Sequence, residues 1–193
     1  MTTGHQFDQV LDSLVRRMRA MHSLWYDACD DMDAAMANYV ERPGILPIAF
    51  TLFHMAALED RSLLKLADRA PLWSQEWADR IQIGIPDHGK ERSVEEMMGQ
   101  QIGNYGAFRD YQRAVFGKTE AWLSTLDPGS LGEVLKTPPF PADLANTFSA
   151  RAAGSAGITR WDGIECWVYQ HGIRHMGELE HARALVGLGG MTS

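Results

Sequence analysis

The sequence predicts an all-α protein, a four-helix bundle with long connections between helices 2 and 3 and between helices 3 and 4. Apolar residues recur at steps of three and four along four long segments, which places them on one face of a helix. Proline or glycine stands at the end of each segment. No strand-helix alternation or internal repeat interrupts the 193 residues, so we expect a single domain over residues 1–193.

The first helix is predicted over residues 7–41. Its apolar residues follow alternating steps of four and three: Phe7, Leu11, Leu14, Met18, Met21, Trp25, Ala28 and Met32. This spacing keeps one stripe on one side of a helix. Pro43 lacks a backbone N–H and Gly44 is flexible, so the helix should end just before them.

The second helix is predicted over residues 46–70. Pro47 suits a first helical turn, where no backbone donor is needed, and Pro71 is the stop signal. Residues 72–92 carry Gly84 and Pro86, so we interpret them as a connection with one short helical turn that covers an end of the bundle.

The third helix is predicted over residues 93–126, before the turn sequence Asp-Pro-Gly. Ser93 and Glu96 match a capping box, in which each side chain accepts a hydrogen bond from the other residue's backbone amide. Three glycines weaken the first half by up to about 1 kcal/mol each relative to alanine, which indicates close packing or a kink there. These are Gly99, Gly103 and Gly106.

The fourth helix is predicted over residues 160–186, because glycines follow it at 187, 189 and 190. Before it, residues 130–158 contain three prolines and several glycines. We therefore expect a long crossing segment there and no core element.

Composition disfavours several classes of protein. Eighteen basic against 25 acidic residues give a net charge of −7, a poor basis for binding nucleic acid. No apolar run approaches the roughly 18 to 20 residues that span a bilayer, and the polar start has no signal-peptide pattern, so we expect a cytoplasmic protein without a membrane partner. Cys29 and Cys166 are far apart and outside any CxxC pattern, which disfavours a disulfide scaffold or a cysteine zinc site.

Two of the seven histidines have the spacing of metal ligands. His171 and His175 are four residues apart in the fourth helix, so they project about 40° apart on one face, one turn from each other. Such a pair can share one metal ion. A catalytic metal needs about three protein ligands and an open position, so a third ligand should come from another helix.

His54 is the best candidate for that third ligand. It lies among apolar residues of the second helix, where a histidine without a metal would need another buried partner. His22, near the apolar stripe of the first helix, is the competitor, while His5 and His88 lie at a frayed start and in a polar connection. The alternative is that the HxxxH pair is solvated or hydrogen-bonded and binds no metal.

These motifs resemble the DinB superfamily of metal-dependent bundle proteins. The resemblance rests on FHMA at 53–56 with EDR at 59–61 in the second helix, and on HGIRHMGE at 171–178 in the fourth. The opening SVEE at 93–96 and the WLSTL at 122–126 also match, so the resemblance extends over about residues 48–190. The HxxxHxGE block is its most specific part.

The resemblance implies a four-helix bundle with one divalent metal ion, zinc or nickel, bound by His54, His171 and His175. Many relatives have a second histidine where this chain has Ala57, which implies an open coordination position. Characterised relatives include mycothiol-dependent maleylpyruvate isomerase and bacillithiol-type S-transferases, and relatives often form homodimers. The resemblance therefore implies a low-molecular-weight thiol as cosubstrate and a small electrophile as substrate.

A divalent ion held by three neutral imidazoles lowers the pKa of a bound thiol or water near neutral pH. Thiol transfer and metal-dependent hydrolysis are both open on this basis. Glu178 is predicted near the same face as His171, where it orients an imidazole or takes a proton, unless it is only a solvated carboxylate. Arg61, seven residues after His54, is a candidate for binding a substrate or cosubstrate carboxylate, with a solvated helix edge as the alternative.

Two other classes of bundle protein are alternatives. Ferritin-like di-iron proteins need two Glu-x-x-His motifs, and only residues 178–181 match one. A non-catalytic bundle that binds a metal or small ligand in a stress response stays open. An enzyme should show a three-histidine site with an open position beside a pocket, whereas a structural site should have a fourth protein ligand.

Overall fold

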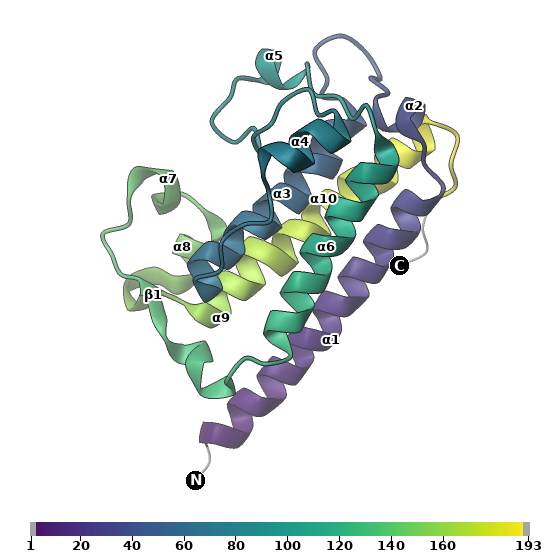
Figure 1. Cartoon of the computed structure of the whole chain (residues 1–193). Coiled ribbons are helices and arrows are strands. Elements are labelled where there is room, and N and C mark those ends of the chain that lie inside the picture. Colours follow the sequence, from purple (N-terminus) through teal and green to yellow (C-terminus); the bar gives the residue numbers. More distant parts are fainter. Residues whose placement is uncertain (1–2, 191–193) are drawn as a thin grey trace.

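The computed structural model describes the backbone of residues 3–190 and the side chains of residues 7–190, and it is a four-helix bundle (Figure 1). Three of the four long helical runs are α1 (Thr3–Asp30), α3 (Ile48–Ala67) and α6 (Tyr105–Leu123). The fourth run is built from α9 (Arg160–Gly163), the π-helix η3 (Ile164–Tyr169) and α10 (Gln170–Leu185). The predicted all-α class and bundle are confirmed.

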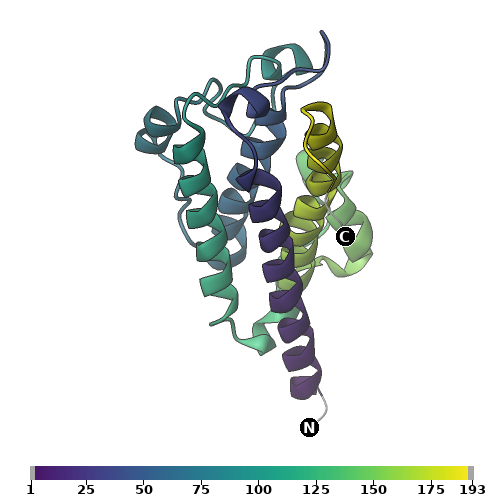
Figure 2. The same ribbon diagram turned by 90° about the vertical axis from the view of Figure 1, so that its right-hand side faces the viewer.

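Each long helix packs against two others, so the order around the bundle is α1, α6, α3, α10 (Figure 2). All four contribute to one cluster of buried side chains, whose largest members include Trp25, Phe53, Phe108 and Tyr111. The contact between α3 and α10 is the one that matters for the histidines, because α3 carries His54 and α10 carries His171 and His175.

The first helix is shorter than predicted. It ends at Asp30, and α2 (Ala34–Ala37) follows as a separate short helix. The cause is Asp33, whose carboxylate accepts a hydrogen bond from the Met36 amide at 2.9 Å and caps the new helix. The predicted end near residue 41 was therefore wrong, and residues 38–47 form a loop beside the start of α3.

The predicted third helix is two helices. The capping box of Ser93 and Glu96 is confirmed, but it caps only the four residues of α5 (Val94–Met97). A break follows, in which Ile102 pairs with Ile83, and Asn104 then caps α6 by accepting from the Ala107 amide at 3.0 Å. Gly103 lies in this break against Gln82, whose side chain would be 2.8 Å from an added Cβ. The close packing predicted for these glycines is therefore confirmed at Gly103 but not at Gly106, where the nearest atom would be 3.6 Å from a Cβ, and the helix is interrupted here instead of kinked.

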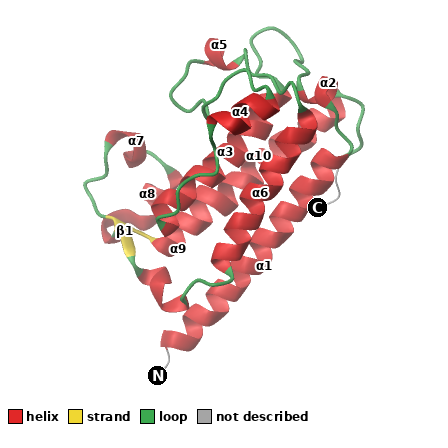
Figure 3. Ribbon diagram, in the orientation of Figure 1, coloured by secondary structure: helices red, strands yellow, loops and turns green. Residues whose placement is uncertain are grey.

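The connections have some structure of their own (Figure 3). In the first, α4 (Gln75–Ile81) is the predicted short helical turn. In the second, two short antiparallel strands pair Val134 with Thr159 and Lys136 with Ile158. The elements of this second connection are η1 (Pro128–Gly132), β1 (Val134–Lys136), α7 (Ala142–Ala145), α8 (Phe148–Ala153), η2 (Gly154–Ala156) and β2 (Ile158–Thr159).

The fourth helical run has the predicted extent, but its middle is a π-helix. The π-helix is wider than an α-helix because each backbone N–H bonds to the carbonyl five residues back. Angles between residues in an ideal α-helix therefore do not hold across η3. Among residues 3–190, no helix combines the length and apolar character needed to cross a membrane.

Candidate metal centre

His54 from α3 and His171 and His175 from α10 meet between the two helices, as the sequence predicts. One ligand atom from each lies within 4.8 Å of the others, and no other set of three His, Cys, Asp or Glu residues in the described chain forms such a group. Ring centroids are 5.3 Å apart for His54 and His171, and 4.4 Å apart for His171 and His175. We call these three residues the histidine triad. All are half-buried.

Hydrogen bonds set the tautomers of two of the rings. Nδ1 of His54 donates to the His88 carbonyl at 2.5 Å, and Nδ1 of His175 donates to Oε2 of Glu178 at 2.6 Å. A carbonyl and a carboxylate only accept, so both Nδ1 atoms carry the proton. In the neutral rings Nε2 then carries the lone pair, which is the form that binds a metal.

The spacing of the rings fits a small divalent ion. Nε2 of His171 lies 3.0 Å from Nε2 of His175. Metal to nitrogen bonds of about 2.0–2.1 Å put neighbouring ligand nitrogens of a tetrahedral site about 3.3 Å apart, so a small shift suffices. Within the described residues the group contains no carboxylate, and Ala57 offers no ligand atom. The donor set is three imidazoles with room for a fourth, exogenous ligand.

The rings of His54 and His171 are neutral at pH 7. Burial lowers the pKa of His54 to about 4, although the His88 carbonyl opposes the shift and the nearby His175 adds to it. Burial also lowers the pKa of His171 to about 3, with further lowering from His175 and His54. A proton therefore does not compete for these nitrogens near neutral pH.

Gly172 lets α10 approach the core at the level of the triad. A Cβ at this position would collide with the Met21 sulfur and lie 3.1 Å from Cε of Met55. The Gly172 carbonyl also accepts a hydrogen bond from Nε1 of Trp25 at 3.2 Å. These contacts fix the depth and rotation of α10, so His171 and His175 face α3.

The loop at residues 87–89 holds the ring of His54 in place through the His88 carbonyl. Gly89 has a φ of +75°, and a Cβ there would lie 2.7 Å from Phe50, so the turn that presents the His88 carbonyl requires glycine. From the sequence, His88 was predicted to be only part of a polar connection. It contacts His54 through its backbone carbonyl, 34 residues away in sequence, and a backbone contact cannot be predicted from the type of side chain.

The other two predicted site residues lie at the edge of the triad. Glu178 contacts His175, as predicted for a residue that orients an imidazole. Arg61 is exposed, and its Nη1 lies 2.7 Å from Nε2 of His88, so it reaches the triad only through the loop that holds His54. The His175 contact lowers the pKa of Glu178, which keeps that carboxylate ionised.

A pocket of about 420 Å³ opens beside the triad, and His175 and Glu178 are part of its wall. The opposite wall comes from residues 39–51, the loop after α2 and the start of α3. Phe50 belongs to this wall and also stacks on His54, with ring centroids 5.0 Å apart. The triad therefore borders a space large enough for a small organic molecule.

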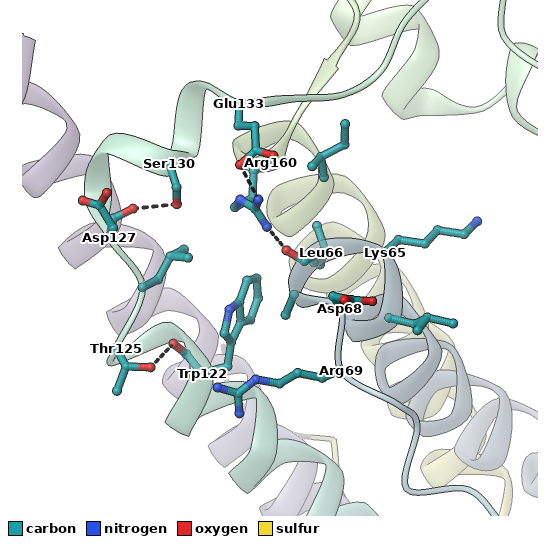
Figure 4. A pocket seen from close by; sticks show the side chains of 14 residues that line it. Lys65, Leu66, Asp68, Arg69, Trp122, Thr125, Asp127, Ser130, Glu133 and Arg160 are labelled. Carbon is teal, nitrogen blue, oxygen red and sulfur yellow. Dashed lines mark hydrogen bonds and ion pairs between the residues drawn. The ribbon is translucent and has the colours of Figure 1, made fainter.

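A larger pocket of about 630 Å³ lies at the other end of α3, around its last turn (Figure 4). Arg160 points into it, donating to the Leu66 carbonyl and to Glu133 at 2.5 Å. Lys65 also lines this pocket. None of the triad residues lines it, so we place the candidate chemistry in the smaller pocket.

His22, the competitor for the third ligand, belongs to a different cluster. It is fully buried between α1, α3 and α6, with Nε2 3.1 Å from Glu59 and Nδ1 2.7 Å from Glu120. Burial favours the neutral ring, but the two carboxylates outweigh it and raise the pKa to about 9. Its ring stacks on Phe116 with centroids 4.0 Å apart. This cluster was not predicted from the sequence. The side chain of His5, another histidine of the first helix, lies outside the described residues.

Comparisons with known proteins support the fold alone. No protein-family model and no curated protein matches the chain. A crystal structure of a conserved protein from Enterococcus faecalis is similar, with a TM-score of 0.72 and 20% sequence identity over 92% of this chain and 96% of that one. The resemblance to the DinB superfamily stays a prediction.

Proposed function

We propose that this protein is a metal-dependent enzyme that binds one divalent ion through the histidine triad and acts on a small molecule held in the adjacent pocket. The observation that carries the proposal is the convergence of three imidazoles whose ligand atoms lie within 4.8 Å of one another. Further support comes from the pocket, which shares His175 with the triad and leaves space for a substrate.

When bound, the ion would lower the pKa of a thiol or water in the open position, so that a thiolate or hydroxide is available near neutral pH. The chain's own residues prepare the site. His88 and Glu178 hold the protons on Nδ1 of His54 and His175, which keeps both rings aimed at the centre. The carboxylate of Glu178 also raises the basicity of His175 as a ligand.

The nucleophile of this proposal is a low-molecular-weight thiol, as the resemblance to the DinB superfamily implies. In the proposed reaction its sulfur forms a carbon–sulfur bond with a small electrophile, either by addition or by displacement of a leaving group, or the thiol adds and is released again in an isomerisation. The proton lost by the thiol would pass to a base at the pocket, for which Glu178, in the pocket wall and in contact with His175, is the candidate. Hydrolysis by activated water, and metal binding without turnover, are the competing outcomes.

The first experiment is metal analysis of the purified full chain after incubation with zinc or nickel and removal of excess ion. We expect about one ion per chain for the wild type and almost none for His54→Ala and His175→Ala. His181→Ala is the matched control for metal content, because His181 is an exposed histidine of α10 that lines the same pocket but is not part of the triad. Metal content that is unchanged in both triad variants, or absent from the wild type, rules out the proposal.

The second experiment separates the reaction types. The metal-loaded protein is assayed with mycothiol, bacillithiol and glutathione against a panel of small electrophiles, and with esters and amides in the absence of thiol. Thiol consumption that requires His54 and His175 supports the transferase. Thiol-independent cleavage with the same requirement favours the hydrolase, and no turnover in a protein that binds one ion favours the non-catalytic bundle.

A further inference from the structure

We infer that the pocket beside the triad binds the uncharged, largely apolar body of the substrate, with the reactive group directed at His175. This inference rests on the proposed function and names the class of molecule on which it acts. It differs from the expectation that Arg61 anchors a substrate carboxylate, because Arg61 does not line this pocket.

Most of the side chains that line the pocket are apolar. One wall is formed by the loop and first turn of α3, and the other by the second half of α10. The apolar side chains of these walls are Tyr39, Ile45, Leu46, Pro47, Ile48, Phe50, Ala182 and Leu185. Tyr39 and Ile45 are each 37% exposed, and removing such apolar surface from water is favourable.

The pocket extends from the triad along α10. Phe50 stacks on His54, and His175 and Glu178 belong to the pocket wall, so the pocket begins at the triad. Leu185 lies ten residues, nearly three turns, beyond His175 on α10, which extends the apolar surface away from the triad along that helix. A ligand with a reactive head at the triad would therefore lay an apolar tail between α10 and the loop.

Charge also favours an uncharged ligand. None of the described residues that line the pocket is a lysine or arginine, whereas the carboxylates of Glu41 and Glu178 both line it and His181 is a further imidazole of the lining. Arg42 approaches Glu41 at 3.7 Å from outside the lining and is largely exposed. A ligand carboxylate would lose its hydration here beside two carboxylates and without a lysine or arginine partner, so the pocket should disfavour anionic tails. Cationic Arg61 lies instead beside His88.

The test begins with the metal-free chain, carrying labelled isoleucine methyl groups, titrated with octanamide and followed by NMR. We expect saturable shifts at Ile45 and Ile48, which line the pocket, and none at Ile173, which does not. Octanamide with a carboxylate at its far end should bind at least tenfold more weakly. Shifts that spare both pocket isoleucines, or equal binding of the two amides, overturn the inference.

A matched pair of variants then tests where the apolar body of the ligand binds. Ile45→Asp and Ile173→Asp change residues of similar exposure, 37% and 39%, so neither should prevent folding. Only Ile45→Asp should weaken octanamide binding, by tenfold or more. Equal effects of the two substitutions, or no effect of either, would argue that the apolar body binds elsewhere.

The link to the triad is tested with Co²⁺-loaded protein and hydroxamates, which bind metals through their head group, by following the cobalt absorption spectrum. Octanohydroxamate should bind at least tenfold more tightly than acetohydroxamate, and Ile45→Asp should abolish that difference without weakening acetohydroxamate. If acetohydroxamate binds and the longer tail adds nothing, the apolar pocket is refuted while the metal site stands. If cobalt does not bind but octanamide still shifts Ile45, the metal site fails and the apolar pocket stands.

Discussion

Two histidine clusters lie in the same bundle and have opposite electrostatics. The triad brings three imidazoles together without a carboxylate in the group, and burial lowers the pKa of both His54 and His171. The other cluster surrounds the single imidazole of His22 with Glu59 and Glu120, and its pKa rises to about 9. Both clusters use α3, where His54 and Glu59 are only five residues apart.

The difference shows that burial alone does not decide what a histidine does. Around His22 the bundle supplies negative charge, so the ring holds a proton and forms a buried ion pair. Around the triad, within the described residues, the group itself contains only imidazoles, and those of His54 and His171 are neutral at pH 7, so they can act as donors to the metal ion proposed above. The His22 cluster is therefore an ion pair within the chain, whereas the triad is a set of donor groups.

The largest effect should come from disrupting the His22 cluster. His22→Ala leaves Glu59 buried without its partner, and we expect a loss of about 3–5 kcal/mol in the free energy of unfolding, measured in urea. Replacing both His22 and Glu59 by leucine should restore most of that loss, because the remaining carboxylate, Glu120, is 29% exposed and keeps Arg19 at 3.7 Å. A loss below about 1 kcal/mol for the single variant would contradict the ion pair.

Next in size is the packing beneath the triad. Gly172→Ala forces a Cβ against Met21 and Met55, and we expect a loss of roughly 1–3 kcal/mol in unfolding free energy together with weaker metal binding. Gly177→Ala is the matched control, because a Cβ there meets nothing within 4 Å. The control should gain up to about 1 kcal/mol from helix propensity. Equal results for the two variants would refute the close approach of α10.

A smaller effect is expected from the carboxylate that serves the triad. Glu178→Ala removes the acceptor of the His175 proton and should lower metal affinity by roughly 10–100-fold, as measured by competition with a chelator. Glu180→Ala alters a glutamate on the same helix that is outside the triad's contacts and should leave the affinity unchanged. If both variants bind metal like the wild type, Glu178 is only a solvated carboxylate.

Close to neutral pH the smallest effect is a pH dependence in which the two clusters oppose each other, measured on chelator-treated protein, and it grows with distance from the optimum. The His22 pKa of about 9 lies above its unfolded value of 6.5, so its stabilisation is complete below pH 6.5 and lost as the pH rises through 9. The pKa values of His54 and His171, about 4 and 3, lie below 6.5, so stability falls as the pH drops from 6.5 towards those values. From these groups alone, stability should peak near pH 6.5.

Each limb of that profile has its own variant. Each limb has a slope of up to about 1.4 kcal/mol per pH unit for each proton involved. Glu120→Gln should flatten the alkaline limb only, because it weakens the ion pair of His22. His171→Ala should flatten the acid limb only. A profile in which either variant changes both limbs would show that the clusters are not independent.

The sequence predicted the parts that depend on local periodicity. The helix spacing of His171 and His175 predicted that they lie together, and His54 was predicted as the third ligand because it lies among apolar residues of the second helix. The breaks at residues 31–33 and 98–104 were missed, since the first depends on the Asp33 cap and the second on pairing between Ile83 and Ile102. The His22 cluster joins three helices, so no single stretch of sequence displays it.

The π-helix η3 has a consequence for how this chain tolerates insertions and deletions. It lies immediately before α10, and one residue more or less in its six residues would change the rotation of all of α10 relative to α9. Such a change would move His171 and His175 away from α3 without altering either histidine. We therefore expect the length of residues 164–169 to be as essential to the triad as the identity of its ligands.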